Sequence, residues 1–320
     1  VLRGRSAVPH RETFGMTRRG WILFAALCVL WGIPYLLIKV AVRHLAPADL
    51  VFARTAIGTL LLLPIALGRG QVRPVLARWR PLLLYSLVEI AIAWFLLSEA
   101  ETRISSSLSG LLVAAVPLVG ILIVRATGTK DRLTRTRLAG LLLGIAGVAA
   151  VLGFDVGHIT VLAILEMGVV VVCYALGPQI LTRTLARLPS LGVVSCSLAI
   201  CTLLYAPAAI LQRPSAIPSL SVIGAVLTLG VVCTAVAFLV FFALIGEVGP
   251  VRATVVTYIN PAVAVALGVT LLDEHFTVGI GLGFVLVLVG SVLATWRGDR
   301  GQVGVPAGLE AAVETAVIER

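Results

Sequence analysis

Three charged residues stand inside long apolar stretches of the sequence and could do chemistry there. Glu89 is flanked by LVEIAIAW, Glu166 by AILEMGVV, and Arg54 lies in VFARTAIGT. A charge at the centre of a bilayer costs roughly 2.5–3.5 kcal/mol on insertion scales, so such residues are candidates for function. Apolar surroundings favour the neutral form of a carboxyl group, which suits a group that binds and releases a proton. We expect Glu89, eight residues past Pro81, to be the first candidate and Glu166 the second.

Each of these charges also has a structural interpretation. Either carboxyl group could make only a hydrogen bond to a neighbouring helix. Arg54 could pair with an acidic side chain, hold Glu89 ionised if the two meet, or orient its helix. Lys39, near the end of an apolar stretch, can reach the membrane surface with its long side chain and is interpreted as structural.

Aromatic and helix-breaking residues could complete a binding site. The faces of aromatic rings accept apolar or cationic solutes. Asn260 precedes Pro261, which frees backbone carbonyl groups inside a helix and could bend it or expose those groups to a substrate. The aromatic residues that we expect to line a central cavity are Trp31, Tyr35, Trp94, Tyr174 and Tyr258.

The elements that position these side chains must be membrane helices. Of the 320 residues, 59% are apolar and 12% are charged, about half of the charged share in soluble domains. A helix needs about 17–25 apolar residues to cross a bilayer. The sequence predicts an all-α integral membrane protein with ten such spans, at residues 21–42, 50–68, 82–98, 104–124, 138–154, 159–181, 190–211, 220–245, 251–272 and 277–296.

The charges between the spans predict the orientation. Of the 25 Lys and Arg residues, 20 fall on one side of a ten-span arrangement and 3 on the other. Positive residues stay on the cytoplasmic side, so we expect a multi-pass protein of the cytoplasmic (inner) membrane. Residues 1–20 and 298–320 would then be cytoplasmic tails. The net charge of +10 is explained in this way, and no basic stripe with interleaved aromatic residues indicates a nucleic-acid partner.

The sequence indicates no cofactor. Its five cysteines all lie within apolar stretches, without a CxxC pair or a cluster with histidine, so neither a disulfide nor a metal site is predicted. No glycine-rich phosphate loop is present, so ATP-driven pumping is not supported.

The two halves of the chain share features at a nearly constant spacing. Trp31 and Tyr174 are 143 residues apart, as are Phe95 and Phe238, while Pro117 and Pro261 are 144 apart. A repeat with five spans has an odd number of crossings, so its second copy must insert upside down. We therefore predict two inverted five-helix repeats, residues 21–154 and 159–296, an architecture typical of secondary transporters.

The chain resembles EamA-type members of the drug/metabolite transporter superfamily over about residues 17–297. The resemblance rests on LWGIPYLLIKVAV, LAPADLVFARTAIGTLLLLP, SSSLSGLLVAAVPLVGILI and RLAGLLLGIAGVAAVLG, and in the second half on INPAVAVALGVTLLDEHFT and GIGLGFVLVLVGSVLAT. Trp31-Gly32, Arg54, Pro117, Pro261 and Glu274 fall where the family has such residues. The second half departs from the first at two places. Tyr174-Ala175 stands where the first half has Trp31-Gly32, and Cys196-Ser197 stands at the place that matches Arg54, so no basic residue is present there. The resemblance implies a secondary carrier, often an exporter of metabolites or drugs.

Two other function classes remain open at this point. His44 and Asp49 form an HxxxxD pattern, which could serve general-base chemistry in an integral-membrane enzyme such as a lipid acyltransferase. A channel or scaffold is the third possibility. The sequence fixes neither the small-molecule substrate, nor the direction of transport, nor the coupling ion, nor the oligomeric state.

The predicted orientation can be tested by labelling introduced cysteines. A cysteine at Ala77 should react with an impermeant maleimide only after cells are opened, because its loop is strongly basic. A cysteine at His44, on the opposite side, serves as the matched control and should react in intact cells. Labelling at position 77 from outside would refute the orientation.

Overall fold

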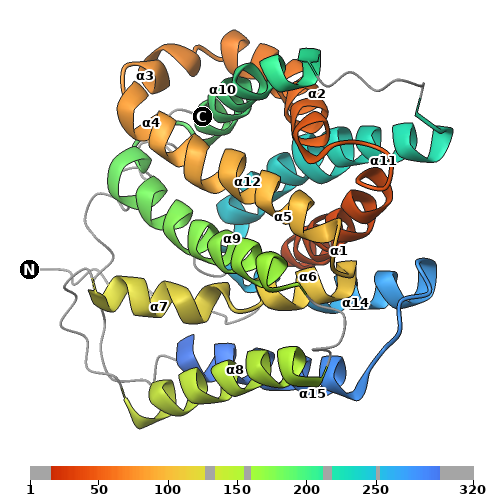
Figure 1. The fold of residues 1–320 in the computed structure, drawn as a ribbon. Coiled ribbons are helices and arrows are strands. Elements are labelled where there is room, and N and C mark those ends of the chain that lie inside the picture. Colours follow the sequence, from red (N-terminus) through yellow and green to blue (C-terminus); the bar gives the residue numbers. More distant parts are fainter. Residues whose placement is uncertain (1–15, 127–133, 155–159, 212–217, 250–252, 296–320) are drawn as a thin grey trace, which may run out of the picture.

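A computed structural model describes residues 16–126, 134–154, 160–211, 218–249 and 253–295. Within these ranges the chain forms helices and turns and no strand. Figure 1 shows the helices as closely packed, mostly antiparallel or crossing rods. The expected tails lie outside the described ranges except for residues 16–20, where α1 already begins at Arg18.

Seven helical segments are long and apolar enough to cross a membrane. Two of them contain a π-helical segment between α-helices, one ends in such a segment, and one is a broken helix. The seven are α1 (Arg18–Ala41), α2 (Pro47–Gly68), α4–η1–α5 (Trp79–Tyr85, Ser86–Ile92, Ala93–Glu101), α6 with α7 (Ser106–Val113, Val116–Ala126), α9–η2 (Val161–Ile180, Leu181–Leu185), α10 (Ser190–Leu211) and α11–η3–α12 (Leu220–Gly230, Val231–Val236, Ala237–Val248).

Three further helices lie in the remaining predicted spans. They are α8 (Arg135–Phe154), α14 (Asn260–Leu271), which follows the short 3₁₀ helix η4 (Thr254–Tyr258), and α15 (Val278–Thr295). The apolar segments Val255–Leu271 and Val278–Ala294 are shorter than the seven long segments. The all-helical fold is therefore confirmed, while the count of ten spans stays a prediction. A short helix that was not expected, α3 (Val72–Leu76), connects α2 to α4.

Local sequence explains where the helices begin. Thr17 caps α1 by accepting a hydrogen bond from the backbone N–H of Gly20 at 3.0 Å, and Ser105 caps α6 through the N–H of Leu108 at 3.2 Å. Pro47 begins α2, at a position where its missing N–H costs nothing. Gly249 ends α12 with a φ of 80°, a conformation that favours glycine.

Irregular backbone occurs at similar places in both halves. The π-helical segments Ser86–Ile92 and Val231–Val236 interrupt the third and eighth predicted spans. The helix breaks between α6 and α7, just before Pro117, and the backbone changes from η4 to α14 just before Pro261. Proline removes a backbone donor and π segments often mark functional sites, so these interruptions are candidate positions for a site.

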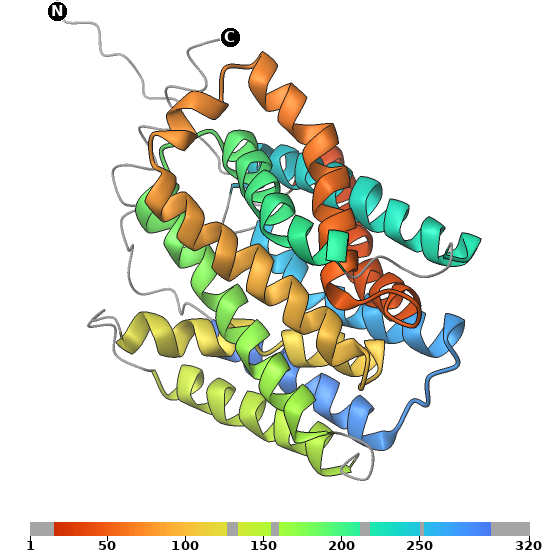
Figure 2. The same cartoon turned by 45° about the horizontal axis from the view of Figure 1, so that its top comes forward.

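Close helix pairs join the first half of the chain to the second. Figures 1 and 2 show α8 running alongside α15, and the glycines on their facing sides leave no room for a side chain. A Cβ atom on Gly140 would lie 2.3 Å from the backbone nitrogen of Ala294. Helices α2 and α10 also pack together, and the hydroxyl groups of Thr59 and Thr202 meet at 3.3 Å.

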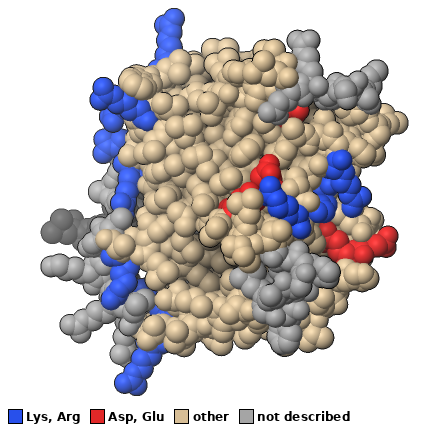
Figure 3. Space-filling model, viewed as in Figure 1, with Lys and Arg blue, Asp and Glu red and all other residues tan. Residues whose placement is uncertain are grey.

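Large apolar side chains cover the outside of the molecule. Leu203 is 74% exposed and Leu211 and Leu220 are each 84% exposed, which is expected where the neighbour is lipid and not water. Charge gathers at two opposite ends, and in Figure 3 the left edge is basic while the right side carries both signs. Exposed arginines stand in or beside the connections after α2, α7 and η2, namely Arg69, Arg73, Arg78, Arg80, Arg125, Arg135, Arg183 and Arg187.

The α8–α15 contact predicts a sharp effect of one substitution. Gly290→Val places a side chain where a Cβ would already lie 2.4 Å from the backbone nitrogen of Gly144. Because backbone atoms cannot give way, we expect a loss of about 2 kcal/mol or more in stability, measured as thermal unfolding in detergent. Gly224→Ala is the matched control, since nothing lies within 4 Å of a Cβ there; an equal loss in both variants would contradict the interpretation.

Candidate functional site

Arg54 is buried at the junction of the two halves. Its side chain comes from α2, and the residue is 7% exposed. The guanidinium carbon lies 3.6 Å from the ring centroid of Trp94 on α5, and Nε donates a hydrogen bond of 2.9 Å to Oγ1 of Thr234 in η3. A guanidinium can stack on an indole ring and donate in its own plane at the same time. Arg54 therefore links the π segment of the second half to α5 of the first.

Two tyrosines complete a central cluster with Arg54 and Trp94. Tyr35 on α1 and Tyr174 on α9 both interact electrostatically with Arg54, and Tyr35 is 7% exposed. Tyr174 packs against both large apolar cores of the molecule. Four of the residues expected from the sequence are thus brought together by helices of both halves. We call Arg54, Trp94, Tyr35 and Tyr174 the central cluster.

Glu89 reaches the second half from the π segment η1. Its Oε2 atom is buried and has no hydrogen-bond partner. The carboxyl group lies over Gly177 of α9, where an added Cβ would be within 1.7 Å of Oε2. Glu89 interacts electrostatically with Tyr174 of the central cluster. Arg54 makes its hydrogen bond to Thr234, so the arrangement in which Arg54 holds Glu89 ionised is not the one in this structure.

Glu166 lies in different surroundings from those expected. Both of its carboxylate oxygens accept hydrogen bonds from Nη1 of Arg103, at 2.9 and 2.8 Å, and the same guanidinium contacts Glu99 at 2.5 Å. Burial alone would lower the pKa of Arg103, but the two carboxylates raise it above its usual value. The expectation of an apolar environment for Glu166 was wrong, because Arg103 folds back from the α5–α6 turn onto α9.

Three other expected site residues make contacts elsewhere. The ring of Trp31 lies 4.9 Å from that of Phe241 on α12. In the orientation that satisfies its amide, Asn260 donates to the carbonyl groups of Cys28 at 3.2 Å and Val256 at 2.9 Å, so it ties η4 to α1. Tyr258 is half-buried at the end of η4.

Glu101 is a buried charge that sequence reasoning did not single out. It is fully buried, and neither carboxylate oxygen has a hydrogen-bond partner. It lies three residues past the end of the span predicted at residues 82–98. A usable signal was present, since Trp94, Leu97 and Glu101 recur at helical spacing on the face of α5 that is buried.

Glu274 fastens the loop after α14 to the start of α6. Its carboxylate accepts hydrogen bonds from the backbone N–H and hydroxyl group of Ser106, at 2.7 and 2.9 Å, and of Ser107, at 2.9 and 2.5 Å. Gly268 leaves room for this contact, because a Cβ there would lie 2.3 Å from the Ser107 hydroxyl oxygen. A carboxylate at the N-terminus of a helix is favoured by the unpaired N–H groups and the helix dipole. We call this contact the outer clasp.

A pattern that describes a whole family matches the chain twice. The EamA-like transporter family matches residues 18–153 and again residues 161–296. The chain belongs to this family. It is a membrane transporter, and its two EamA matches coincide with the two halves that meet at the central cluster.

Relatives of this EamA chain carry transporter names. A protein of Escherichia coli (strain K12) named "Uncharacterized inner membrane transporter YedA" is 30% identical over 281 residues, covering 84% of this chain and 88% of the relative. "Uncharacterized transporter YvbV" of Bacillus subtilis is 27% identical, covering 86% and 91%. A solved structure titled "Crystal structure of protein" matches with a TM-score of 0.62 and 23% identity over 86% of this chain, which supports the fold.

The two HxxxxD residues of the EamA chain have different surroundings in this structure. His44 is exposed in the turn between α1 and α2, and Oδ1 of Asp49 is buried without a hydrogen-bond partner. Asp49 instead lines a mostly apolar pocket of about 350 Å³ between α2, α10 and α11. Among the described residues, no group of three or more His, Cys, Asp or Glu side chains could hold a metal ion.

The outer clasp predicts a pH-dependent contribution to stability. Partial burial alone would raise the pKa of Glu274, but the hydrogen bonds from Ser107 and Ser106 outweigh it and hold the pKa below its ordinary value of 4.5. A carboxyl group whose pKa is lowered in the folded protein stabilises the fold at pH values above its pKa in the unfolded chain. This contribution is lost as the pH falls from about 4.5 through the lower pKa of the folded protein. Glu274→Gln should therefore lower stability by about 2 kcal/mol at neutral pH.

The measurement is thermal unfolding of both proteins against pH. The difference between wild type and Glu274→Gln should be constant near neutrality and shrink as the pH falls below 4.5. Asp273→Asn is the matched control, because Asp273 is exposed and its positive φ of 53° suits asparagine. A difference that does not depend on pH would show that the charge of Glu274 is unimportant.

Proposed function

We propose that this EamA protein is a secondary transporter that moves a small metabolite or drug-like molecule across the cytoplasmic membrane by alternating access, as a proton-coupled exporter. The observation that carries the proposal is the central cluster, in which Arg54 of the first half bonds to Thr234 of the second. A site shared by two halves can be opened to either side when one half rocks against the other.

Symmetry between the halves supports this mechanism. Helix α1 of the first half packs on α14 of the second, and α9, which begins the second half, packs on α7 of the first. In the same way, η1 of the first half packs on α10, and η3 of the second half packs on α2. Pro64 and Pro207 stand 143 residues apart inside α2 and α10. Such exchanged pairs are expected if residues 21–154 and 159–296 are inverted five-helix units related by an axis in the membrane plane.

The chemistry of the cluster suggests what kind of molecule enters. Two phenol groups and an indole ring provide faces for an apolar or aromatic body, while Arg54 and Glu89 provide one charge of each sign. Because Trp94 is already covered by Arg54, a substrate would bind beside this pair and not between its members. A compact molecule with both apolar and polar parts fits these surroundings.

Glu89 is our candidate for the proton-binding group. Its Oε2 atom has no hydrogen-bond partner, and an ionised carboxylate in such a place is costly. It lies on a π-helical segment, where a small change of winding moves the side chain relative to α9. Gly177, just before Pro178, leaves the space into which the carboxyl group points. Proton loading on one side and release on the other would then drive export.

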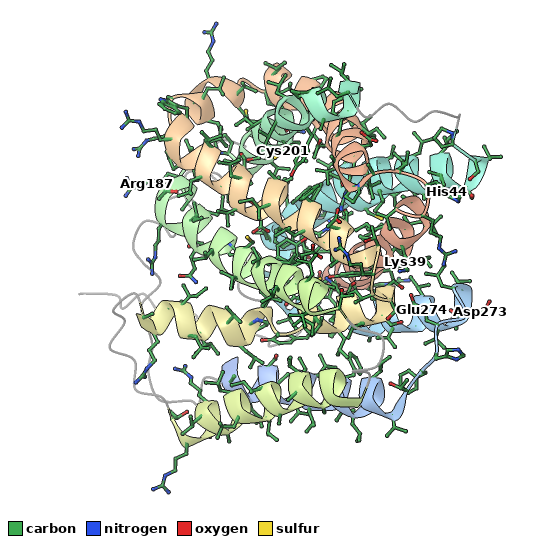
Figure 4. The ribbon with its side chains drawn as sticks, viewed as in Figure 1. Lys39, His44, Arg187, Cys201, Asp273 and Glu274 are labelled. Carbon is green, nitrogen blue, oxygen red and sulfur yellow. The ribbon has the colours of Figure 1, made fainter. Side chains whose placement is uncertain are left out.

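The charged ends of the molecule fit the proposed orientation. Figure 4 places Arg187 at one end and Lys39, His44 and Glu274 at the other. The more basic end would face the cytoplasm together with both termini. The outer clasp and the Arg103–Glu166 pair would then lie on the external side, and in this proposal these contacts between the halves close the outer face.

Glu89→Gln tests the proposed coupling. The substrate is first identified by comparing metabolites released by cells with and without the protein, and transport is then measured in proteoliposomes with an imposed pH gradient. We expect the substitution to abolish gradient-driven accumulation, a loss of tenfold or more, because glutamine cannot carry a proton. Exchange without a gradient should persist, since the shape of the side chain is kept.

Glu99→Gln is the matched control, because Glu99 is half-exposed and lies on the same helical segment. It should retain accumulation within about twofold. If Glu89→Gln transports at the wild-type rate with the same pH dependence, Glu89 is structural and the coupling proposal fails.

A further inference from the structure

The surroundings of Glu101 leave its carboxyl group without a hydrogen-bond partner. The residue ends α5 and is fully buried, and neither carboxylate oxygen has a partner. An ionised carboxylate in such a place loses its hydration without replacement, which is among the most costly arrangements in a protein. A bound proton removes that charge and needs almost no space, so it fits a group with no exposed surface.

The nearby lysine is held away from this carboxyl group. Nζ of Lys39, on α1, donates to the backbone oxygen of Glu101 at 2.6 Å and to that of Ile104 at 2.7 Å. These carbonyl groups end α5 and its following turn, where the helix dipole is negative and attracts a cation. Lys39 is therefore satisfied by the backbone and not by the Glu101 side chain.

The other charged and titratable groups around Glu101 come from every neighbouring part of the site. The charged neighbours that interact electrostatically with Glu101 are Lys39 on α1, Arg54 on α2 and Glu274 in the loop after α14. Glu274 itself is fully occupied by the outer clasp. The tyrosine neighbours that interact electrostatically with Glu101 are Tyr35 on α1 and Tyr174 on α9.

We propose that Glu101 is a second proton-binding residue, protonated in this closed structure, and that its proton controls the position of the Lys39 ammonium group. When Glu101 releases its proton to the outside, the new carboxylate attracts Lys39 from the carbonyl groups of Glu101 and Ile104. When the proton returns, Lys39 goes back to the carbonyl groups. No other reactant is needed, because the proton goes to and comes from water.

The geometry connects this movement to the outer clasp. Ile104 directly precedes Ser105, the cap of α6, and Ser106 and Ser107, which donate to Glu274. A turn that loses its contact with Lys39 at Ile104 no longer holds these donors in place. Proton loss at Glu101 thus loosens the clasp and favours opening to the outside. This last step rests on the proposed function, whereas the proton site does not.

Infrared spectroscopy tests the proton site without any substrate. The purified protein with Glu89→Gln and Asp49→Asn, which remove the two other described acids that have a buried oxygen without a partner, should show at neutral pH the carbonyl stretch of a buried protonated carboxyl group. Adding Glu101→Gln should abolish this band, whereas adding Glu99→Gln should leave it unchanged. A band of equal intensity with and without Glu101 overturns the proposal, as does its absence at neutral pH before Glu101 is changed.

Glu101→Asp in the same background gives a second test should the glutamine variant fail to fold. The shorter acid keeps a proton in a changed environment, so the band should move. A band that neither moves nor weakens belongs to another group and also overturns the proposal. Because neither measurement involves transport, a failure here is distinguishable from a failure of the Glu89→Gln transport test.

Cysteine labelling tests the connection to the clasp. Ser109 is fully buried one helical turn beyond Ser106, so Ser109→Cys should react with an external maleimide only when the clasp opens. Relative to an exposed cysteine at His44, which corrects for the faster reaction of thiolates at high pH, we expect labelling to rise severalfold with external pH, and to be low and independent of pH with Glu101→Gln. Lys39→Met should be labelled strongly at every pH. The same pH dependence with and without Glu101 overturns the connection.

Discussion

A polar or charged group that is buried in a membrane protein needs a partner inside the protein, because lipid offers none. In this chain the partners repeatedly lie on the other half. Arg54 donates to Thr234, Arg103 binds Glu166, and Glu274 binds the start of α6. The contacts that give these buried polar groups a partner are therefore also contacts that hold the two halves together. Glycines of α8 and α15 add close packing that requires no polar group.

Much of the fold could be predicted because lipid makes the sequence signal simple. Apolar stretches located the helices, and the constant spacing of about 143 residues located the two halves that both match the EamA family. The interruptions were harder to foresee. Proline indicated the interruption before Pro261, whereas Pro117 was used only as a feature of the repeat. Nothing in the apolar sequences SLVEIAI and VVCTAV distinguishes a π segment from an α-helix, since the difference depends on packing against neighbouring helices.

The side chains of the site were predicted only where burial depends on helical position alone. Arg54, Trp94, Tyr35 and Tyr174 meet because each lies well inside a helix. The surroundings of Glu166 and Glu101 were not predicted, because both depend on the path of the turn between α5 and α6. The α5–α6 turn directs Arg103 onto Glu166 and supplies carbonyl groups to Lys39, leaving Glu101 as the acid without a partner. The path of a turn depends on such tertiary contacts, which sequence spacing does not encode.

In the alternating-access mechanism that we propose, contacts between the halves have to be strong enough to close a face and weak enough to open it. The Arg103 side chain, which binds Glu166 of the other half, is 28% exposed, and pairs open to water are worth only roughly 0–1 kcal/mol. Water can replace such contacts when the outer face opens. Arg54 is covered by Trp94 and bonded to Thr234 inside the protein, so its separation would leave a buried charge without a partner. A mechanism that keeps Arg54 in place as a pivot while the outer contacts exchange with water therefore costs the least free energy.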